Sequence, residues 1–295
     1  MSSPKPLILS TGRLELTLNP SIGGSISALE WIAGDRRFPV LRKCNSCSEN
    51  VLEAASFPLV PYVNRIRGGR FAFRGLEVLL APNMAGDPSP LHGQGWLAPW
   101  EIESSTTTDA VLSFRHPPGE WPWEYRAEQH FEIDEGGLSM RLICRNLSEG
   151  PMPCGLGQHP YFNCGPGTRL DTKVSHVWTI DEHVLPVEKI DAVGRFNLRE
   201  RLVCGQDLDH GFGGWAGTVR MTDPDWPFDV ELTSPDAHFF QLYSPASGGI
   251  FVAEPVSHAN AALNAPEEQW EELGMKVLQP GDEMSLSMRL DVTGK

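Results

Sequence analysis

Four segments of the chain place polar side chains among glycines, prolines and aromatic residues. They are residues 61–71 (PYVNRIRGGRF), 91–96 (LHGQGW), 155–163 (GLGQHPYFN) and 249–255 (GIFVAEP). Loops on a rigid scaffold carry a large share of the binding and catalytic residues of proteins. These segments are therefore the candidate functional site.

Glu254 and His159 are the residues in these segments best suited to acid–base chemistry. Glu254 ends the apolar run 250–253, where partial desolvation would raise the pKa of a carboxylate and strengthen it as a base. An imidazole such as that of His159 titrates near neutrality and can both give and take a proton. Each residue directly precedes a proline, which favours an extended backbone. The alternatives are an exposed strand-end glutamate and a histidine satisfied inside an aromatic core.

Taken in order along the chain, five motifs resemble those of the aldose 1-epimerase (galactose mutarotase-like) family. The matching residues are Asn64-Arg65-Ile66, Leu91-His92-Gly93, His159-Pro160-Tyr161-Phe162-Asn163, Asp209-His210-Gly211-Phe212 and Glu254. The resemblance spans nearly the whole chain. It implies an isomerase that interconverts the α and β anomers of a free sugar, with no cofactor and no metal, on a large antiparallel β-sandwich of the galactose mutarotase-like supersandwich type.

The chain departs from the family pattern in two places. Gln94 stands where a second glycine often follows Leu-His-Gly, and Glu254 is followed by Pro255-Val256-Ser257-His258. At these positions the chain resembles a divergent bacterial branch of the family more than the galactose enzymes. The identity of the sugar therefore stays open.

The resemblance also implies a role for each matched residue. Opening a cyclic hemiacetal removes the proton of the anomeric hydroxyl and delivers a proton to the ring oxygen, so Glu254 is expected as the base and His159 as the acid. Arg65 and His92 would bind the sugar and stabilise developing charge, and Asp209 would accept hydrogen bonds from hydroxyls. The other expected lining residues are Asn64, Gln158, Phe162, Trp96 and His258. Structural alternatives are a surface ion pair for Arg65 and turn positions for His92 and Asp209.

The elements that must hold these segments are mainly strands, because the apolar residues alternate with a period of two. Residues 125–134 and 138–144 are expected to form a hairpin, with Glu135-Gly136-Gly137 supplying positive φ angles at the turn. A strand with Met284, Leu286, Met288, Leu290 and Val292 on one face is expected after the turn Pro280-Gly281-Asp282, and Leu14, Leu16 and Leu18 mark another strand near the start.

The helical signals are few. The best is residues 266–273, with Pro266 at the first helical position and Gly274 as a stop. The sequence thus predicts an all-β fold with few short helices. Strands at both ends of the chain favour one continuous sheet system, and residues 1–295 are expected to form a single domain.

Composition excludes several classes of partner. The formal net charge is −14, and no run of Lys or Arg exceeds Arg36-Arg37, so nucleic acid and anionic membranes are poor partners. No segment approaches the roughly 18 apolar residues of a membrane span, and a cytoplasmic location is expected, as a monomer or homodimer. Cys44 and Cys47 form a CxxC without a second motif that would complete a zinc site. A loop with two thiols is the favoured interpretation.

Three rival functions remain open at this level. A sugar-phosphate mutarotase would need extra cations around the pocket, for which Arg65, Arg67 and Arg70 are the candidates. A carbohydrate-binding or sensor protein would be expected to lack the base or the acid, and both are present. A glycoside hydrolase usually needs two carboxylates that flank the glycosidic bond, and Glu254 and Asp209 are the only candidates for this pair.

Overall fold

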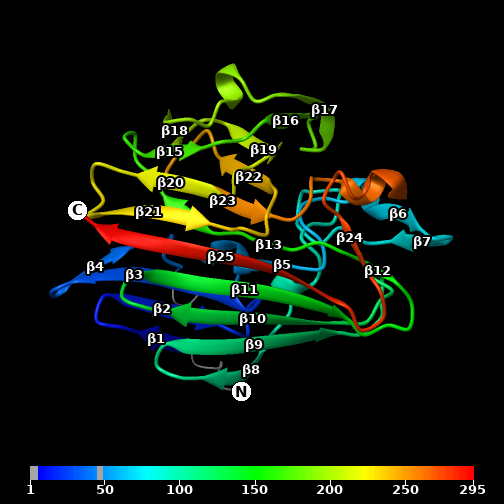
Figure 1. Ribbon diagram of the computed structural model, residues 1–295, viewed down its shortest axis with the longest axis horizontal. Coiled ribbons are helices and arrows are strands. Elements are labelled where there is room, and N and C mark those ends of the chain that lie inside the picture. The colour runs from blue at the N-terminus through cyan, green and yellow to red at the C-terminus, as the bar shows by residue number, and fades with distance from the viewer. Residues whose placement is uncertain (1–5, 45–48) are drawn as a thin grey trace.

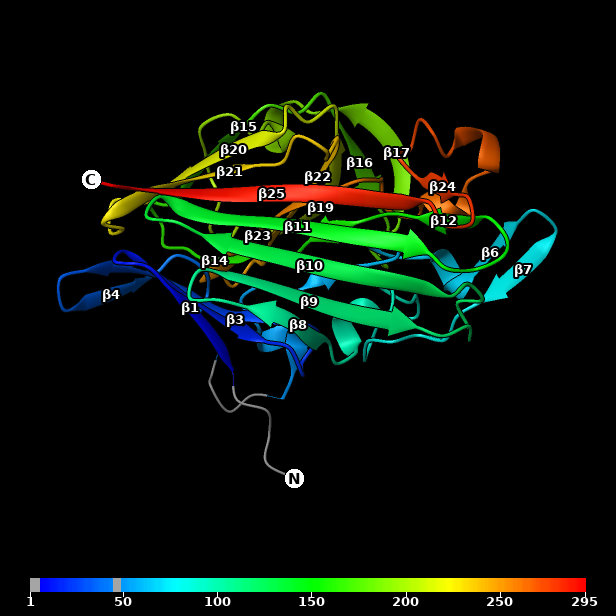
Figure 2. The same ribbon diagram turned by 60° about the horizontal axis from the view of Figure 1, so that its bottom comes forward.

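The computed structural model describes residues 6–44 and 49–295. Its architecture is a nine-stranded sheet packed against an eight-stranded sheet, with a four-stranded sheet and two two-stranded sheets at the margins (Figures 1 and 2). The named strands pair antiparallel throughout these described ranges. The prediction of an all-β antiparallel sandwich with few short helices is confirmed.

The nine-stranded sheet has the order β18-β15-β20-β21-β25-β11-β10-β9-β8. Its strands are β8 (Glu101–Ser105), β9 (Asp109–His116), β10 (Tyr125–Ile133), β11 (Gly137–Asn146), β15 (Arg169–Thr172), β18 (Arg201–Leu202), β20 (Thr218–Thr222), β21 (Phe228–Thr233) and β25 (Glu283–Gly294). The C-terminal strand β25 lies between β11 and β21, so the end of the chain closes the middle of this sheet (Figure 2).

The eight-stranded sheet carries the floor of the candidate site. Its order is β17-β16-β19-β22-β23-β13-β5, and β14 also pairs with β23. Its strands are β5 (Pro58–Leu59), β13 (Gly157–Gln158), β14 (Tyr161–Asn163), β16 (His176–Ile180), β17 (Pro186–Asp191), β19 (Leu208–Gly213), β22 (Phe239–Ser244) and β23 (Ile250–Val256).

Smaller elements complete the fold. The four-stranded sheet holds β1 (Leu7–Ser10), β2 (Leu14–Asn19), β3 (Ser25–Ala33) and β4 (Arg36–Pro39), and the two-stranded pairs are β6 (Arg70–Phe73) with β7 (Leu76–Leu79) and β12 (Met152–Cys154) with β24 (Lys276–Leu278). The 3-10 helices are η1 (Val51–Glu53), η2 (Arg67–Gly69), η3 (Gly95–Leu97), η4 (Gly194–Phe196), η5 (Ala262–Asn264) and η6 (Glu267–Gln269).

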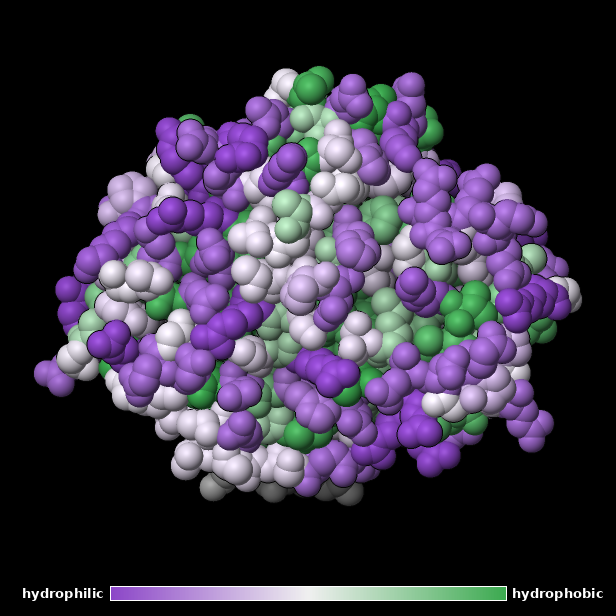
Figure 3. Space-filling view, in the orientation of Figure 1, coloured by the Kyte–Doolittle hydropathy of each residue, from purple (hydrophilic) through white to green (hydrophobic). Residues whose placement is uncertain are grey.

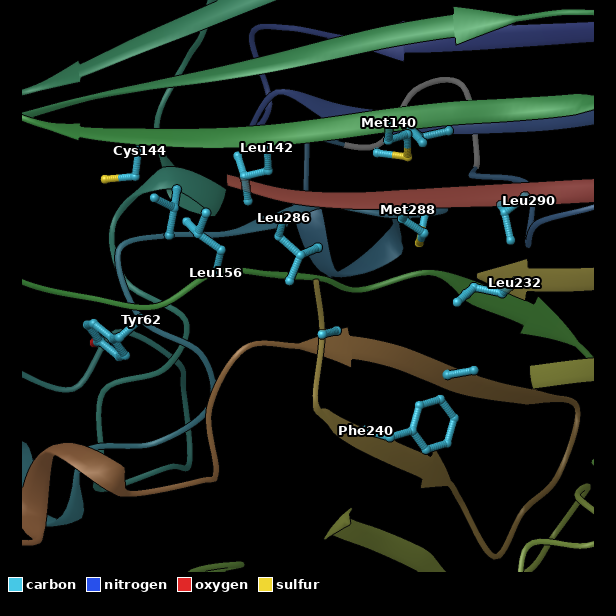
Figure 4. Close-up of a cluster of buried hydrophobic side chains, with 14 of the residues drawn as sticks. Tyr62, Met140, Leu142, Cys144, Leu156, Leu232, Phe240, Leu286, Met288 and Leu290 are labelled. Atoms are coloured by element: carbon cyan, nitrogen blue, oxygen red, sulfur yellow. The ribbon is translucent and has the colours of Figure 1, made fainter. Parts of the chain in front are cut away.

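The core lies between the two large sheets, where alternate side chains of each strand meet. Leu286 and Met288 on β25 point toward Phe240 on β22 across this layer (Figure 4). Complete burial of one such side chain contributes about 1.5–3 kcal/mol. The alternate side chains along each strand point away from the core. On the eight-stranded sheet, this outer face carries the candidate site.

The hairpin over residues 125–144 is confirmed, but its turn differs from the prediction. None of Glu135, Gly136 and Gly137 has a positive φ. The Asp134 side chain instead accepts hydrogen bonds from the backbone N–H groups of Gly136 and Gly137. Gly137 is needed for space, since a Cβ there would lie 2.1 Å from the carbonyl oxygen of Leu290.

The helix expected over residues 266–273 is shorter than predicted. Only η6 (Glu267–Gln269) is helical, with Pro266 preceding it as the cap. Turns then lead to Gly274, whose φ is +83°. Buried Trp270 ends η6 and stacks on Phe73 of the β6–β7 hairpin. The Leu273 N–H still donates to the Gln269 carbonyl, so one further turn follows η6 before the chain leaves the helical direction.

Two other predictions concern the chain as a whole. No helix in the described ranges is long and apolar enough to cross a membrane. On the face seen in Figure 3, hydrophobic residues form scattered patches among hydrophilic ones. The single domain of residues 1–295 stays a prediction. Cys44 follows the first sheet, whereas Cys47, the other half of the CxxC, lies outside the described residues.

Candidate active site

A pocket of about 260 Å³ opens on the face of the eight-stranded sheet that looks away from the core. Its lining residues come from four of the sheet's strands and from the segments that cross over them. They are Leu52, Phe57, Asn64, Arg65, Met84, Leu91, His92, Trp96, His159, Tyr161, Asp209, Gln241, Tyr243 and Glu254. The four segments singled out in the sequence thus meet at one place.

Strand register fixes the floor of the pocket. Glu254 on β23 is the cross-strand partner of Gln241 on β22. Their neighbours in sequence, such as Phe240 and Ala253, are fully buried in the core, so the alternation of a strand sends Glu254 and Gln241 to the opposite face. One strand further on, Asp209 on β19 pairs with Tyr243, and Gln241 Nε2 donates a hydrogen bond of 2.7 Å to Asp209 Oδ1.

His159 faces Glu254 within the pocket. The imidazole Nε2 of His159 lies 3.5 Å from Oε1 of Glu254, and their side chains are only 11% and 4% exposed. The His159 ring stacks on Phe57 with 4.4 Å between centroids and lies 4.7 Å from the ring of Tyr161. These aromatic contacts fix the plane of the imidazole.

Burial shifts the pKa values of this pair in opposite directions. Desolvation, together with the negative charge of Asp209, raises the pKa of Glu254 well above its usual range, against an opposing contribution from Arg65. Desolvation lowers the pKa of His159 to about 3. Burial thus favours the neutral form of each group, the protonated carboxylic acid of Glu254 and the uncharged imidazole of His159.

Two hydrogen bonds join Asn64 and His92. Both adopt positive φ angles, 56° and 60°. The backbone N–H of His92 donates to the carbonyl of Asn64, and the backbone N–H of Asn64 donates to Nδ1 of His92 at 3.1 Å. Neutral His92 therefore carries its proton on Nε2, which remains as a donor. Burial, and the nearby His159 and Arg65, lower the pKa of His92 well below its usual value.

Arg65 and Asp209 provide the other charged groups of the lining. Arg65 is nearly buried and ion-paired with Asp87, whose carboxylate oxygen Oδ2 lies 2.8 Å from Nε. Desolvation raises the pKa of Asp209, while Arg65 and the Gln241 hydrogen bond oppose that rise. The pocket therefore combines one guanidinium with two carboxylates of elevated pKa.

Three residues expected in the lining lie outside it, and their roles in binding stay predictions. Phe162 is fully buried and stacks on Phe251 in the core, because alternation on β14 sends Tyr161 to the pocket and Phe162 inward. Gln158, the last residue of β13, is buried outside the lining. His258 accepts a hydrogen bond from the Val63 N–H and supports the loop beneath the site. Trp96 does line the pocket.

Several lining residues were not anticipated from the sequence, above all Gln241, Tyr243, Phe57 and Met84. Gln241 had a detectable signal, because it is the polar residue in the apolar stretch Phe239–Leu242. Among the described residues there is no cluster of three or more His, Cys, Asp or Glu side chains arranged to hold a metal ion.

This constellation of a buried carboxylate and imidazole in a sugar-sized pocket on a β-sandwich agrees with the similarity of the chain to known proteins. A family model of aldose 1-epimerases matches residues 9–291. The chain belongs to the aldose 1-epimerase family.

Individual relatives support this assignment. The chain is 32% identical over 251 residues to the uncharacterized protein YphB of Escherichia coli (strain K12), covering 81% of this chain and 84% of that protein. A crystal structure of a candidate aldose 1-epimerase from Escherichia coli K12 is similar with a TM-score of 0.87 and 29% identity, over 99% of both chains. A galactose mutarotase-like protein from Clostridium acetobutylicum shares the fold, with a TM-score of 0.83 and 17% identity over 98% and 95% of the two chains.

Proposed function

We propose that this protein is an aldose 1-epimerase that interconverts the α and β anomers of a free, uncharged sugar. The observation that carries the proposal is the buried pair of Glu254 and His159, 3.5 Å apart in the wall of a pocket of about 260 Å³. A carboxylate and an imidazole that together hold one proton supply both a base and an acid.

The reaction moves two protons and breaks one ring bond. Glu254 takes the proton of the anomeric hydroxyl while the bond between the anomeric carbon and the ring oxygen breaks and His159 gives its proton to that oxygen. The open-chain aldehyde then turns about the bond next to its carbonyl group. The same groups return both protons as the ring closes on the other face of the carbonyl, so no atom or electron is gained or lost.

Sugar binding prepares the pair for these roles. In the empty pocket burial favours the proton on Glu254. A bound sugar offers a hydroxyl donor to the carboxylate and a ring-oxygen acceptor to the imidazole, and hydrogen bonds to a charged form favour that form. Moving the proton from Glu254 to His159 leaves the total charge of the pair unchanged. Arg65 and the Nε2–H of His92 then serve as donors to the charge that develops on oxygen.

The charges of the pocket favour a neutral substrate over a sugar phosphate. In the described lining Arg65 is the one guanidinium, and it is already paired with Asp87. Arg67 and Arg70 are outside the lining and pair at the surface with Asp181 and Glu77. A phosphate dianion would therefore face two carboxylates without a free cation to bind it.

The experiment that tests the proposal follows mutarotation of freshly dissolved α-anomers of glucose, galactose, fucose, arabinose and xylose by polarimetry or NMR. At least one sugar is expected to equilibrate faster with the protein than in buffer alone. If a sugar binds and none equilibrates faster, the protein is a sugar-binding or sensor protein and the proposal fails.

A further inference from the structure

Asp87 is the ion-pair partner of Arg65 and is not part of the pocket lining. Its Oδ2 accepts a hydrogen bond of 2.8 Å from Nε of Arg65. Both side chains are less than a tenth exposed, at 8% and 9%. Water screens the attraction within such a pair less than in the exposed pairs on the surface, and removal of one partner leaves an uncompensated buried charge.

The carboxylate of Asp87 is itself held in one orientation. Its second oxygen, Oδ1, accepts a hydrogen bond of 2.9 Å from the backbone N–H of Ser89. The same loop is tied to the His92 motif by Asn83, whose amide bonds to both the N–H and the carbonyl of Leu91. The loop over residues 81–90 is therefore anchored beside the pocket, and its Met84 forms part of the lining.

Arg65 is held by two hydrogen bonds of its guanidinium and one of its backbone. Asp87 binds Nε, the Asn64 side chain accepts from Nη1 at 3.1 Å, and the backbone N–H of Arg65 donates to Asn260. A guanidinium is a planar fork of five donors. With Nε committed to Asp87 and one N–H of Nη1 to Asn64, the other N–H groups of Nη1 and Nη2 remain for hydroxyl groups in the pocket.

Asp87 also balances a charge that acts on the whole site. The titratable groups that line the pocket around Glu254 are Arg65, His92, His159, Tyr161, Asp209 and Tyr243, with Arg42 packed behind the ring of Tyr161. Arg65 lowers the pKa values of both Glu254 and Asp209, and Asp87 raises that of Asp209. Without Asp87 the guanidinium would be drawn to these two carboxylates.

We propose that Asp87 is a positioning residue for the epimerase reaction: it acts through Arg65, directing the Nη groups to the sugar and keeping the guanidinium from pairing with Glu254 and Asp209. This inference rests on the proposed function. Asp87 does not touch the reacting atoms. It determines the orientation of the one guanidinium of the described lining and the strength of its electrostatic effect on Glu254.

The test compares Asp87→Asn with wild type. The amide keeps the size of the side chain and an oxygen for the Ser89 N–H, but it loses the charge that holds Arg65. We expect KM to rise about 10-fold or more, because misaligned binding groups weaken substrate positioning. We also expect the alkaline limb of the pH profile to move to lower pH, because uncompensated Arg65 lowers the pKa of Glu254 further.

Two further variants separate positioning from a merely structural effect. Asp87→Glu restores the charge and should recover part of the KM change and the pH profile. Asp181→Asn removes the exposed partner of neighbouring Arg67 and serves as the matched control, with KM and pH profile like wild type. A lower melting temperature of Asp87→Asn with wild-type KM and pH profile would overturn the inference.

Two readouts distinguish this inference from the proposed function. Sugar binding is followed by NMR titration of the sugar signals, and the Nε–H signal of Arg65 is followed by NMR of the protein. If wild type binds a sugar without epimerising it, the proposed function fails, while weaker binding and a faster-exchanging Arg65 Nε–H in Asp87→Asn still support positioning. If these two readouts match wild type, or if wild type binds no sugar, the inference falls.

Discussion

The backbone N–H of Asn64 donates a hydrogen bond to Nδ1 of His92, and the backbone N–H of His92 donates to the carbonyl of Asn64. This reciprocal contact joins two motifs that are far apart in sequence and sets the tautomer of the histidine. It separates a structural nitrogen, Nδ1, from a nitrogen available for chemistry, Nε2. The two nitrogens can therefore be tested separately.

His92→Asn is expected to fold like wild type and to lose activity. An asparagine oxygen can accept the Asn64 N–H in place of Nδ1, whereas nothing replaces the Nε2 donor, and removal of one such donor typically costs about 10²-fold in rate. His92→Gln is the converse variant, because its amide reaches the Nε2 position and leaves the buried N–H unpaired at a cost of about 1–3 kcal/mol. Thermal unfolding and kcat/KM are measured for both. Full activity in His92→Asn would exclude a donor role.

The pH profile of kcat/KM should be a plateau bounded by the two titrations of the Glu254–His159 pair. As the pH rises through the raised pKa of Glu254, the pair loses its one proton, no acid remains, and the rate falls. As the pH falls toward about 3, the lowered pKa of His159, a second proton binds and no base remains. Rates are measured with the buffer-catalysed rate subtracted at each pH.

An independent measurement checks the pKa of Glu254 that underlies this profile. At neutral pH the infrared spectrum of the empty protein should contain the carbonyl band of a buried, protonated carboxylic acid. That band should be absent in Glu254→Gln. A rate that falls on the alkaline side with the midpoint of an ordinary carboxylate, near pH 4.3, would contradict the raised pKa.

Tyr161 and Phe162 are adjacent residues with opposite expected effects. Phe162→Leu should lower the free energy of unfolding by about 1–2 kcal/mol, because a shorter side chain leaves space beside Phe251, and should leave KM within about twofold of wild type. Tyr161→Leu removes an aromatic wall of the pocket and should raise KM about fivefold, corresponding to about 1 kcal/mol of lost aromatic contact. Urea unfolding and sugar kinetics measure the two effects. A larger KM change in Phe162→Leu would place Phe162 back in the site.

These two residues also mark how far sequence reasoning reaches. The ordered motifs identify Glu254, His159, Arg65, His92, Asn64 and Asp209, and the structure gathers all six around one pocket. Motifs do not state which face of a strand each residue occupies. A shift by one residue exchanges pocket and core, and for that reason Phe162 was expected in the lining.

Gln241 and the hairpin turn show the second limit. Gln241 lies on a strand without a motif, and it becomes part of the site through its register with Glu254 and its bond to Asp209. The alternation of apolar residues predicted the hairpin of β10 and β11. The turn chemistry depended on a side-chain acceptor, Asp134, and on close packing of Gly137 against Leu290, which two glycines in sequence do not specify.

The central claim is that Glu254 and His159 act together as base and acid. The most direct measurement is the rate of anomer exchange of the best sugar, followed by NMR for wild type, Glu254→Gln and His159→Gln, with Glu272→Gln as a surface control and sugar binding measured in parallel. Both site variants should still bind the sugar and lose about 10²-fold or more of the rate, while the control keeps it. If either site variant folds, binds the sugar and exchanges anomers at the wild-type rate, the acid–base assignment is wrong.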